Sequence, residues 1–208
     1  MAADSPAGPA PTITTSNSAS ASFGFTSAAS DLARFECELD GAWFGACGSS
    51  SPGSTTVSGL ADGGHTFKVR AVDAAGNIST VATRTWTVDT TAPVVVLVSP
   101  VSGAVVGSSS VTVTGASSDS TTVVVSMTGQ TAKNATVSDG AWSVTFTGLT
   151  TGAYSVSASQ TDAAGNTGTS ATVWIFTASV RRASSPASAS ASVIVASTGL
   201  AMIASSDQ

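Results

Sequence analysis

An internal repeat is the feature of this sequence that most constrains its fold. Residues 59–83 and residues 148–172 align without a gap at an offset of 89, and 11 of the 25 aligned positions are identical. Both segments contain Gly-Leu, an alternating apolar stretch and the pentapeptide Asp-Ala-Ala-Gly-Asn. A period of this length matches a whole small domain and is too long for one turn of a solenoid. The chain is therefore expected to contain two tandem copies of one module.

The spacing of apolar residues predicts strands. Phe67, Val69 and Ala71 alternate with polar residues in the first copy, and the same alternation surrounds Val156 in the second. A period of two is typical of strands with one buried face and one wet face. No stretch keeps a helical spacing, and the 24 Val and 30 Thr residues favour strands because their branched Cβ suits a pleated surface. We therefore predict an all-β chain.

The domain boundaries follow from composition. The short, Pro-containing segment 88–93 separates a first module, predicted over residues 9–90, from a second, predicted over residues 91–178. Residues 1–8 have the same character and are predicted to be a linker, so the chain is expected to be a fragment of a longer array. Residues 179–208 are rich in Ala and Ser with little apolar surface, which predicts a flexible tail.

Composition excludes several classes of function. Ser, Thr, Ala and Gly make up 122 of the 208 residues, and the chain has 7 Lys and Arg against 12 Asp and Glu, a net charge of -5. Too few basic residues are present for a nucleic-acid surface, and no apolar run of about 18 residues predicts a membrane span. The single His, His65, is expected to be half-exposed at a strand start. With so few His, Lys and clustered acids, no enzyme is predicted.

Two cysteines flank a predicted hairpin. Cys37 and Cys47 lie on either side of Asp40-Gly41, a dipeptide that supplies the positive φ angles of a tight turn. They should face each other across two strands, which favours a disulfide and hence an oxidising, extracytoplasmic location. Free thiols or half of a metal site remain as alternatives.

The sequence of the first copy resembles that of a known protein family. The residues that carry the resemblance are 35–41 (FECELDG), Cys47, 63–77 (GGHTFKVRAVDAAGN) and 86–93 (WTVDTTAP), with 162–166 (DAAGN) in the second copy. They look like the bacterial immunoglobulin-like repeat modules of secreted and cell-surface proteins. The resemblance implies two tandem Ig-like β-sandwich domains of about seven strands each. It also implies a non-catalytic structural or adhesive spacer of an exported bacterial surface protein, with neighbouring Ig-like modules as partners.

The Asp-Ala-Ala-Gly-Asn loops have two interpretations. Asp caps its own backbone in turns, while Gly and Asn tolerate left-handed conformations, so turn chemistry explains them. Alternatively, Asp73, Asn77 and Asp89 supply oxygen ligands to a calcium ion. No cofactor is otherwise predicted.

Four tryptophans complete the candidate residues. Trp43 and Trp142 each follow an Asp-Gly turn and are candidates for stacking on a carbohydrate, whereas Trp86 and Trp174 end the repeated strands and are expected in the core. The alternative function is therefore a carbohydrate- or ligand-binding accessory module of a larger secreted enzyme, with surface glycans or host ligands as partners.

Overall fold

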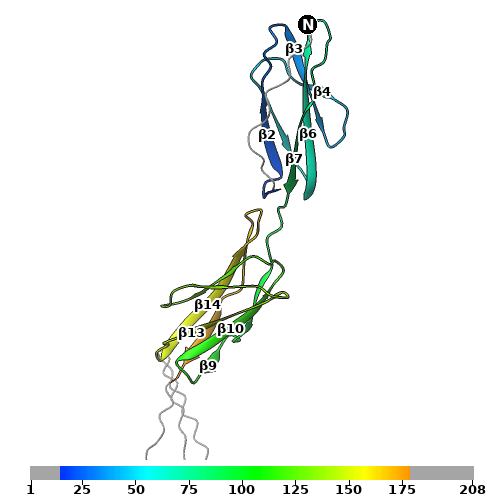
Figure 1. Cartoon of the computed structure of the whole chain (residues 1–208). Helices are drawn as coiled ribbons and strands as arrows, with labels where there is room; N and C mark the ends of the chain where they lie inside the picture. The colour runs from blue at the N-terminus through cyan, green and yellow to red at the C-terminus, as the bar shows by residue number, and fades with distance from the viewer. Residues whose placement is uncertain (1–14, 179–208) are drawn as a thin grey trace, which may run out of the picture. The chain divides into compact units, whose positions relative to one another are not determined.

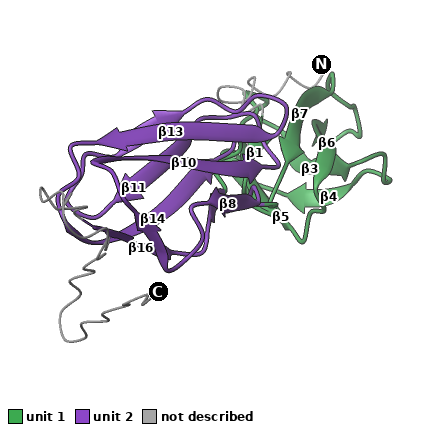
Figure 2. Cartoon of the chain, turned by 90° about the horizontal axis from the view of Figure 1, so that it is seen from below, with its two compact units in different colours: residues 1–91, 163–166 green, residues 92–162, 167–208 purple. Residues whose placement is uncertain are grey.

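The computed structural model describes residues 15–178, and this part of the chain contains strands and turns without a helix (Figure 1). The chain divides into two compact units (Figure 2). Unit 1 comprises residues 1–91 and 163–166, and unit 2 comprises residues 92–162 and 167–208. The predicted linker over residues 1–8 and the predicted tail over residues 179–208 lie outside the described residues and stay predictions.

No helix among residues 15–178 is long and apolar enough to cross a membrane.

Unit 1 is a sandwich of two sheets. Its described strands are β1 (Thr15–Ser16), β2 (Ser20–Phe25), β3 (Leu32–Leu39), β4 (Gly45–Gly48), β5 (Gly53–Ser58), β6 (Gly63–Asp73) and β7 (Ala82–Val88). The larger sheet has the order β1-β7-β6-β3-β4, and β2 pairs with β5 in the smaller one. Only the pairing of β1 with β7 is parallel among these strands.

The core of unit 1 lies between these sheets. The alternation predicted for β6 is confirmed, because Phe67, Val69 and Ala71 are all buried. The ring of Phe23, from the smaller sheet, stacks on Phe67 with 4.0 Å between centroids and lies 5.2 Å from the ring of Trp86. The remaining buried members of the cluster are Phe25, Phe35, Leu60 and Val88.

Unit 2 is a second sandwich. Its described strands are β8 (Val95–Ser99), β9 (Ala104–Val106), β10 (Ser110–Ser117), β11 (Val123–Met127), β12 (Lys133–Ala135), β13 (Ala141–Thr147), β14 (Gly152–Thr161), β15 (Thr167–Thr169) and β16 (Val173–Thr177). One sheet has the order β13-β10-β8 and the other the order β12-β11-β14-β16-β9, with β15 paired to β14.

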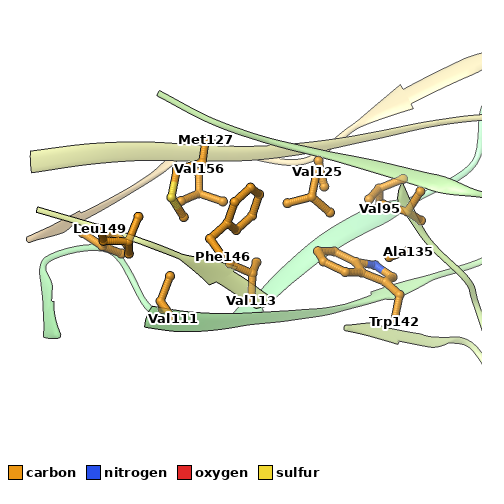
Figure 3. Packing of buried hydrophobic residues seen from close by; sticks show 13 residues of the cluster. Val95, Val111, Val113, Val125, Met127, Ala135, Trp142, Phe146, Leu149 and Val156 are labelled. Atoms are coloured by element: carbon orange, nitrogen blue, oxygen red, sulfur yellow. The ribbon is translucent and has the colours of Figure 1, made fainter. Parts of the chain in front are cut away.

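The core of unit 2 is built mainly from valines around two aromatic residues. Trp142 and Phe146 of β13 point from the three-stranded sheet towards Val125 and Val156 of the larger sheet (Figure 3). Val113, on β10, is fully buried beside them. Alternate positions of β10, β11 and β13 are buried, as period-two strands require.

The two units repeat one topology. In the larger sheets, the order β1-β7-β6-β3-β4 of unit 1 reappears as β9-β16-β14-β11-β12 in unit 2, and in both an edge strand, β1 or β9, pairs in parallel with the last strand of the unit. Strands β6 and β14 begin 89 residues apart, at Gly63 and Gly152. The sequence repeat is therefore a repeat of a whole β-sandwich, and the predicted all-β class is confirmed.

Candidate functional site

The hairpin of β3 and β4 carries the most exposed aromatic side chain of the described chain. Asp40 and Gly41 have φ angles of 51° and 80°, and the amide of Ala42 donates a hydrogen bond to the Leu39 carbonyl at 3.0 Å. Two successive residues with positive φ form the tight turn that Asp-Gly predicts. This turn reverses the chain just before Trp43.

A disulfide closes the hairpin. Cys37 on β3 and Cys47 on β4 are joined, with their Cα atoms 5.8 Å apart. Both side chains also pack against the core of unit 1. The loop between the two cysteines is thus tied to the module on both sides, which restricts the conformations available to Trp43.

Trp43 itself is 98% exposed, so the sequence-based candidate is available to a ligand. Its neighbour Phe44 is half-buried, and the guanidinium carbon of Arg70 lies 4.0 Å from the centre of the Phe44 ring. This is a cation–π contact across the outer face of the larger sheet of unit 1. Trp43 and Phe44 therefore have different roles, the first projecting into solvent and the second covered by a cation.

Ion pairs occupy the rest of that face. Glu36 accepts hydrogen bonds from the Arg34 side chain at 2.8 Å and from the Arg70 side chain at 2.9 Å, and Lys68 donates to Glu38 at 2.7 Å. The register places Glu36 opposite Arg70 and Glu38 opposite Lys68. The hydrogen bonds from Arg34 and then Arg70 lower the pKa of Glu36. Each of these charged side chains therefore has a partner of opposite charge on this face.

His65 is half-buried at the start of β6, as expected, and fixes the hairpin turn. Its ring nitrogens lie 2.8 Å from Oδ2 of Asp40 and 2.8 Å from the carbonyl oxygen of Ala61. Oδ1 of Asp40 accepts a hydrogen bond from the amide of Thr66 at 2.8 Å. Asp40 thus links the turn to β6 and has a structural role.

The three residues of the calcium interpretation are not brought together. Asp73 accepts hydrogen bonds from the backbone and side-chain nitrogens of Asn77, at 2.8 Å and 2.7 Å, which is turn chemistry. Asp89 follows Val88, which pairs with Gly63 at the opposite end of β6, about 33 Å away for ten strand residues. The structure therefore contradicts a calcium site built from all three of these residues. Residues 15–178 hold no group of three His, Cys, Asp or Glu placed for a metal ion.

Two of the tryptophan expectations are wrong. Trp142 is only 3% exposed and packs in the core between Val95 and Ala135, so it cannot stack on a surface ligand (Figure 3). Trp174, expected in the core, is 52% exposed on β16. Trp86 is buried, as expected.

The sequence repeat does predict that the side chain of Trp174 is exposed. At the offset of 89, the residue equivalent to Trp86 is Ile175, and Ile175 is fully buried. Neighbouring residues of a strand face opposite sides, so Trp174 must face outwards. The two Asp-Gly-Ala-Trp segments are likewise not equivalent, because the first lies between β3 and β4, whereas the Ala-Trp of the second begins β13.

Comparison with known proteins identifies the family. The model of the bacterial Ig-like domain matches residues 1–90 and 108–177. These two segments cover more than half of the chain, so the chain belongs to the bacterial Ig-like domain family. No curated protein matches it.

Solved structures are also similar to this chain, at low sequence identity. Titin domains I67–I69 are 12% identical, with a TM-score of 0.50 over 85% of this chain and 67% of that chain. Fibronectin(III)-like modules of Clostridium thermocellum CbhA are 17% identical, with a TM-score of 0.49 over 84% of this chain and 93% of that chain. A 1.5-MDa bacterial ice-binding adhesin is 19% identical, with a TM-score of 0.41 over 79% and 60%.

Proposed function

We propose that this chain is a non-catalytic structural spacer in an exported bacterial cell-surface protein, with further Ig-like modules as its neighbours. The observation that carries the proposal is the duplication of a β-sandwich, with the same strand order in the larger sheet of both units. Stacking copies of a self-contained module extends a chain without new chemistry, because each copy has its own core.

The strand pairing suits a module that is pulled at its ends. In unit 1 the first described strand, β1, pairs in parallel with the last, β7, through Thr15–Thr87 and Ser16–Val88. Tension applied at both ends pulls two parallel neighbours in opposite directions along their length. The hydrogen bonds between them are then loaded together, which resists separation better than opening them one at a time.

The disulfide supports an extracellular location. Disulfides persist in oxidising compartments and are rare where thiols are kept reduced. Both cysteines of the chain are used in the Cys37–Cys47 bond. The disulfide would stabilise a spacer in the oxidising environment outside the cell.

A ligand-binding accessory role is the second candidate, and the exposure of Trp43 favours it. An indole that is almost wholly in water and held on a closed hairpin is a suitable anchor for a partner. The conversion Trp43→Ala should then abolish retention on a glycan or host surface while leaving the fold intact.

The spacer proposal is tested on cells of the bacterium that produces the chain. An antibody raised against the folded chain should label intact cells, and the protein recovered from their surface should contain no free thiol. Labelling that appears only after lysis, together with two free thiols, would contradict it.

A further inference from the structure

The outer face of the larger sheet of unit 2 displays an exposed tryptophan in the middle of a strand. In β16, Ile175 and Thr177 are buried, while Trp174 faces outwards with Phe176, which is half-buried. The backbone of Trp174 is held in place, since its carbonyl accepts a hydrogen bond from Gly103 at 2.6 Å. The indole is therefore mounted on a fixed strand, unlike a side chain on a loose loop.

The register identifies the neighbours of Trp174 on this face. Ser155 of β14 is directly opposite Trp174, and Val105 of β9, which is 51% exposed, is opposite Phe176. The hydroxyl of Ser155 is hydrogen-bonded to the hydroxyl of Thr128. We call one set of outward-facing residues from β9, β11, β14 and β16, together with Thr128 directly after β11, the neutral face: Val105, Val124, Ser126, Thr128, Ala153, Ser155, Ser157, Ser159, Trp174 and Phe176.

No member of the neutral face carries a charge, in contrast to the equivalent face of unit 1. At the offset of 89, Ser157 and Ser159 stand where unit 1 has Lys68 and Arg70, the cations that pair with Glu38 and Glu36 on its outer face. Trp174 stands where unit 1 has Thr85. Unit 2 thus combines aromatic side chains with a row of hydroxyls where unit 1 has ion pairs.

We propose that the neutral face binds an uncharged polysaccharide chain. One side of a pyranose ring presents C–H groups, which the negative face of an indole attracts, and the rim of the ring presents hydroxyls. The Ser157 hydroxyl can donate and accept hydrogen bonds to that rim, and of the hydrogen-bonded Ser155 and Thr128 hydroxyls one keeps its donor hydrogen while both can accept. This ligand is additional to the spacer role and independent of Trp43.

The lack of charge on the neutral face favours an uncharged polysaccharide over an acidic glycan, and its small apolar area favours a polysaccharide over a protein partner. An acidic glycan or a phosphate would need Lys or Arg, and the neutral face has neither. A stable protein interface buries about 800 Å² on each partner. The apolar residues of the neutral face are interspersed with Ser and Thr, which suits a narrow polar chain better than a broad apolar protein surface; they are Val105, Val124, Ala153, Trp174 and Phe176.

Affinity electrophoresis of the full chain tests the proposal. The probes are neutral polymers (mixed-linkage β-glucan, xyloglucan and galactomannan), with alginate as the acidic control. At least one neutral polymer should retard the protein, and Trp174→Thr, which copies unit 1, should weaken the affinity about tenfold or more. Val98→Ala, which shortens an exposed apolar side chain on β8 of the other sheet of unit 2, is the control and should keep full retardation. Thermal unfolding of both variants checks that they remain folded.

A second measurement uses the unaltered protein. The indole N–H signal of Trp174, assigned as the one missing from Trp174→Thr, should shift when a neutral oligosaccharide is added, while those of buried Trp86 and Trp142 should not. The proposal is overturned if no neutral polymer retards the protein, if alginate retards it equally, or if Trp174→Thr has no effect. It is also overturned if sedimentation shows that Trp174 instead mediates self-association.

Discussion

The imidazole of His65 is held against the carboxylate of Asp40, with 2.8 Å between Nδ1 and Oδ2. The other ring nitrogen lies 2.8 Å from the carbonyl oxygen of Ala61. Both partners are acceptors only, so the doubly protonated imidazolium satisfies both contacts and the neutral ring satisfies one. The carbonyl of Ala61, and then Asp40, accordingly raise the pKa of His65 above its ordinary 6.5.

This contact predicts a pH dependence of the stability of unit 1. A pKa that is raised on folding adds stability below pH 6.5, and this stability is lost as pH rises through the folded-state pKa of His65. The hydrogen bond from His65 lowers the pKa of Asp40 on folding. The stability that Asp40 contributes is therefore lost as pH falls through this lowered pKa. Unfolding in urea at a series of pH values measures both windows.

His65 is the only histidine of the chain, so its ring signal can be followed by NMR without assignment. The titration midpoint should lie above 6.5, and His65→Gln should remove the loss of stability on the alkaline side. A midpoint at or below 6.5 would show that the two acceptors do not hold the ring.

Reduction of the Cys37–Cys47 bond should destabilise unit 1 alone. Closing a loop of about 11 residues restricts the unfolded chain and is worth roughly 2–3 kcal/mol. Unit 2 contains no cysteine, so it is an internal control within the same molecule. Urea unfolding with and without reductant measures the difference, and equal shifts in both units would contradict the assignment.

Trp142 and Trp43 provide a matched pair of substitutions. Trp142→Ala removes a core side chain of unit 2 and should cost about 3–5 kcal/mol. Trp43→Ala removes an exposed side chain, and the free energy of unfolding should change by about 0.5 kcal/mol or less. Chemical unfolding of both variants tests the burial of one and the exposure of the other.

Gly115 of β10 lies against the indole of Trp142. A Cβ at this position would be 2.1 Å from Cζ2 of Trp142 and 2.1 Å from the carbonyl oxygen of Val96, which is backbone and cannot easily move. Gly115→Ala should therefore destabilise unit 2 by about 1–3 kcal/mol or prevent it from folding. Gly152→Ala is the control, since a Cβ there meets nothing within 4 Å and should be tolerated.

The sequence predicted the architecture because periodicity and repetition act over long stretches. Alternation in β6 and the gapless offset of 89 were sufficient to indicate strands and two equivalent modules. Individual side chains were harder to place. In β16 the run Val173–Phe176 is wholly apolar, so its pattern does not show which face is buried, and only equivalence with Trp86 orients it.

The candidate sites show the same limit. The sequence predicts the contact between Asp73 and Asn77 because the two residues are close in sequence. It does not predict the position of Asp89, which depends on the register of β6 and β7. Trp142 was misplaced because an Asp-Gly turn indicates a reversal of the chain but not which face the next strand buries.

Stretching single molecules between handles at their two ends tests the spacer role most directly. The account predicts discrete unfolding events for two units. After reduction, the extension released by unit 1 should grow by about 30 Å, because 10 further residues extend at up to ~3.6 Å each, less the 5.8 Å that the Cα atoms of the bonded cysteines already span. Gradual lengthening at low force, with no discrete events and no effect of reductant, would contradict it.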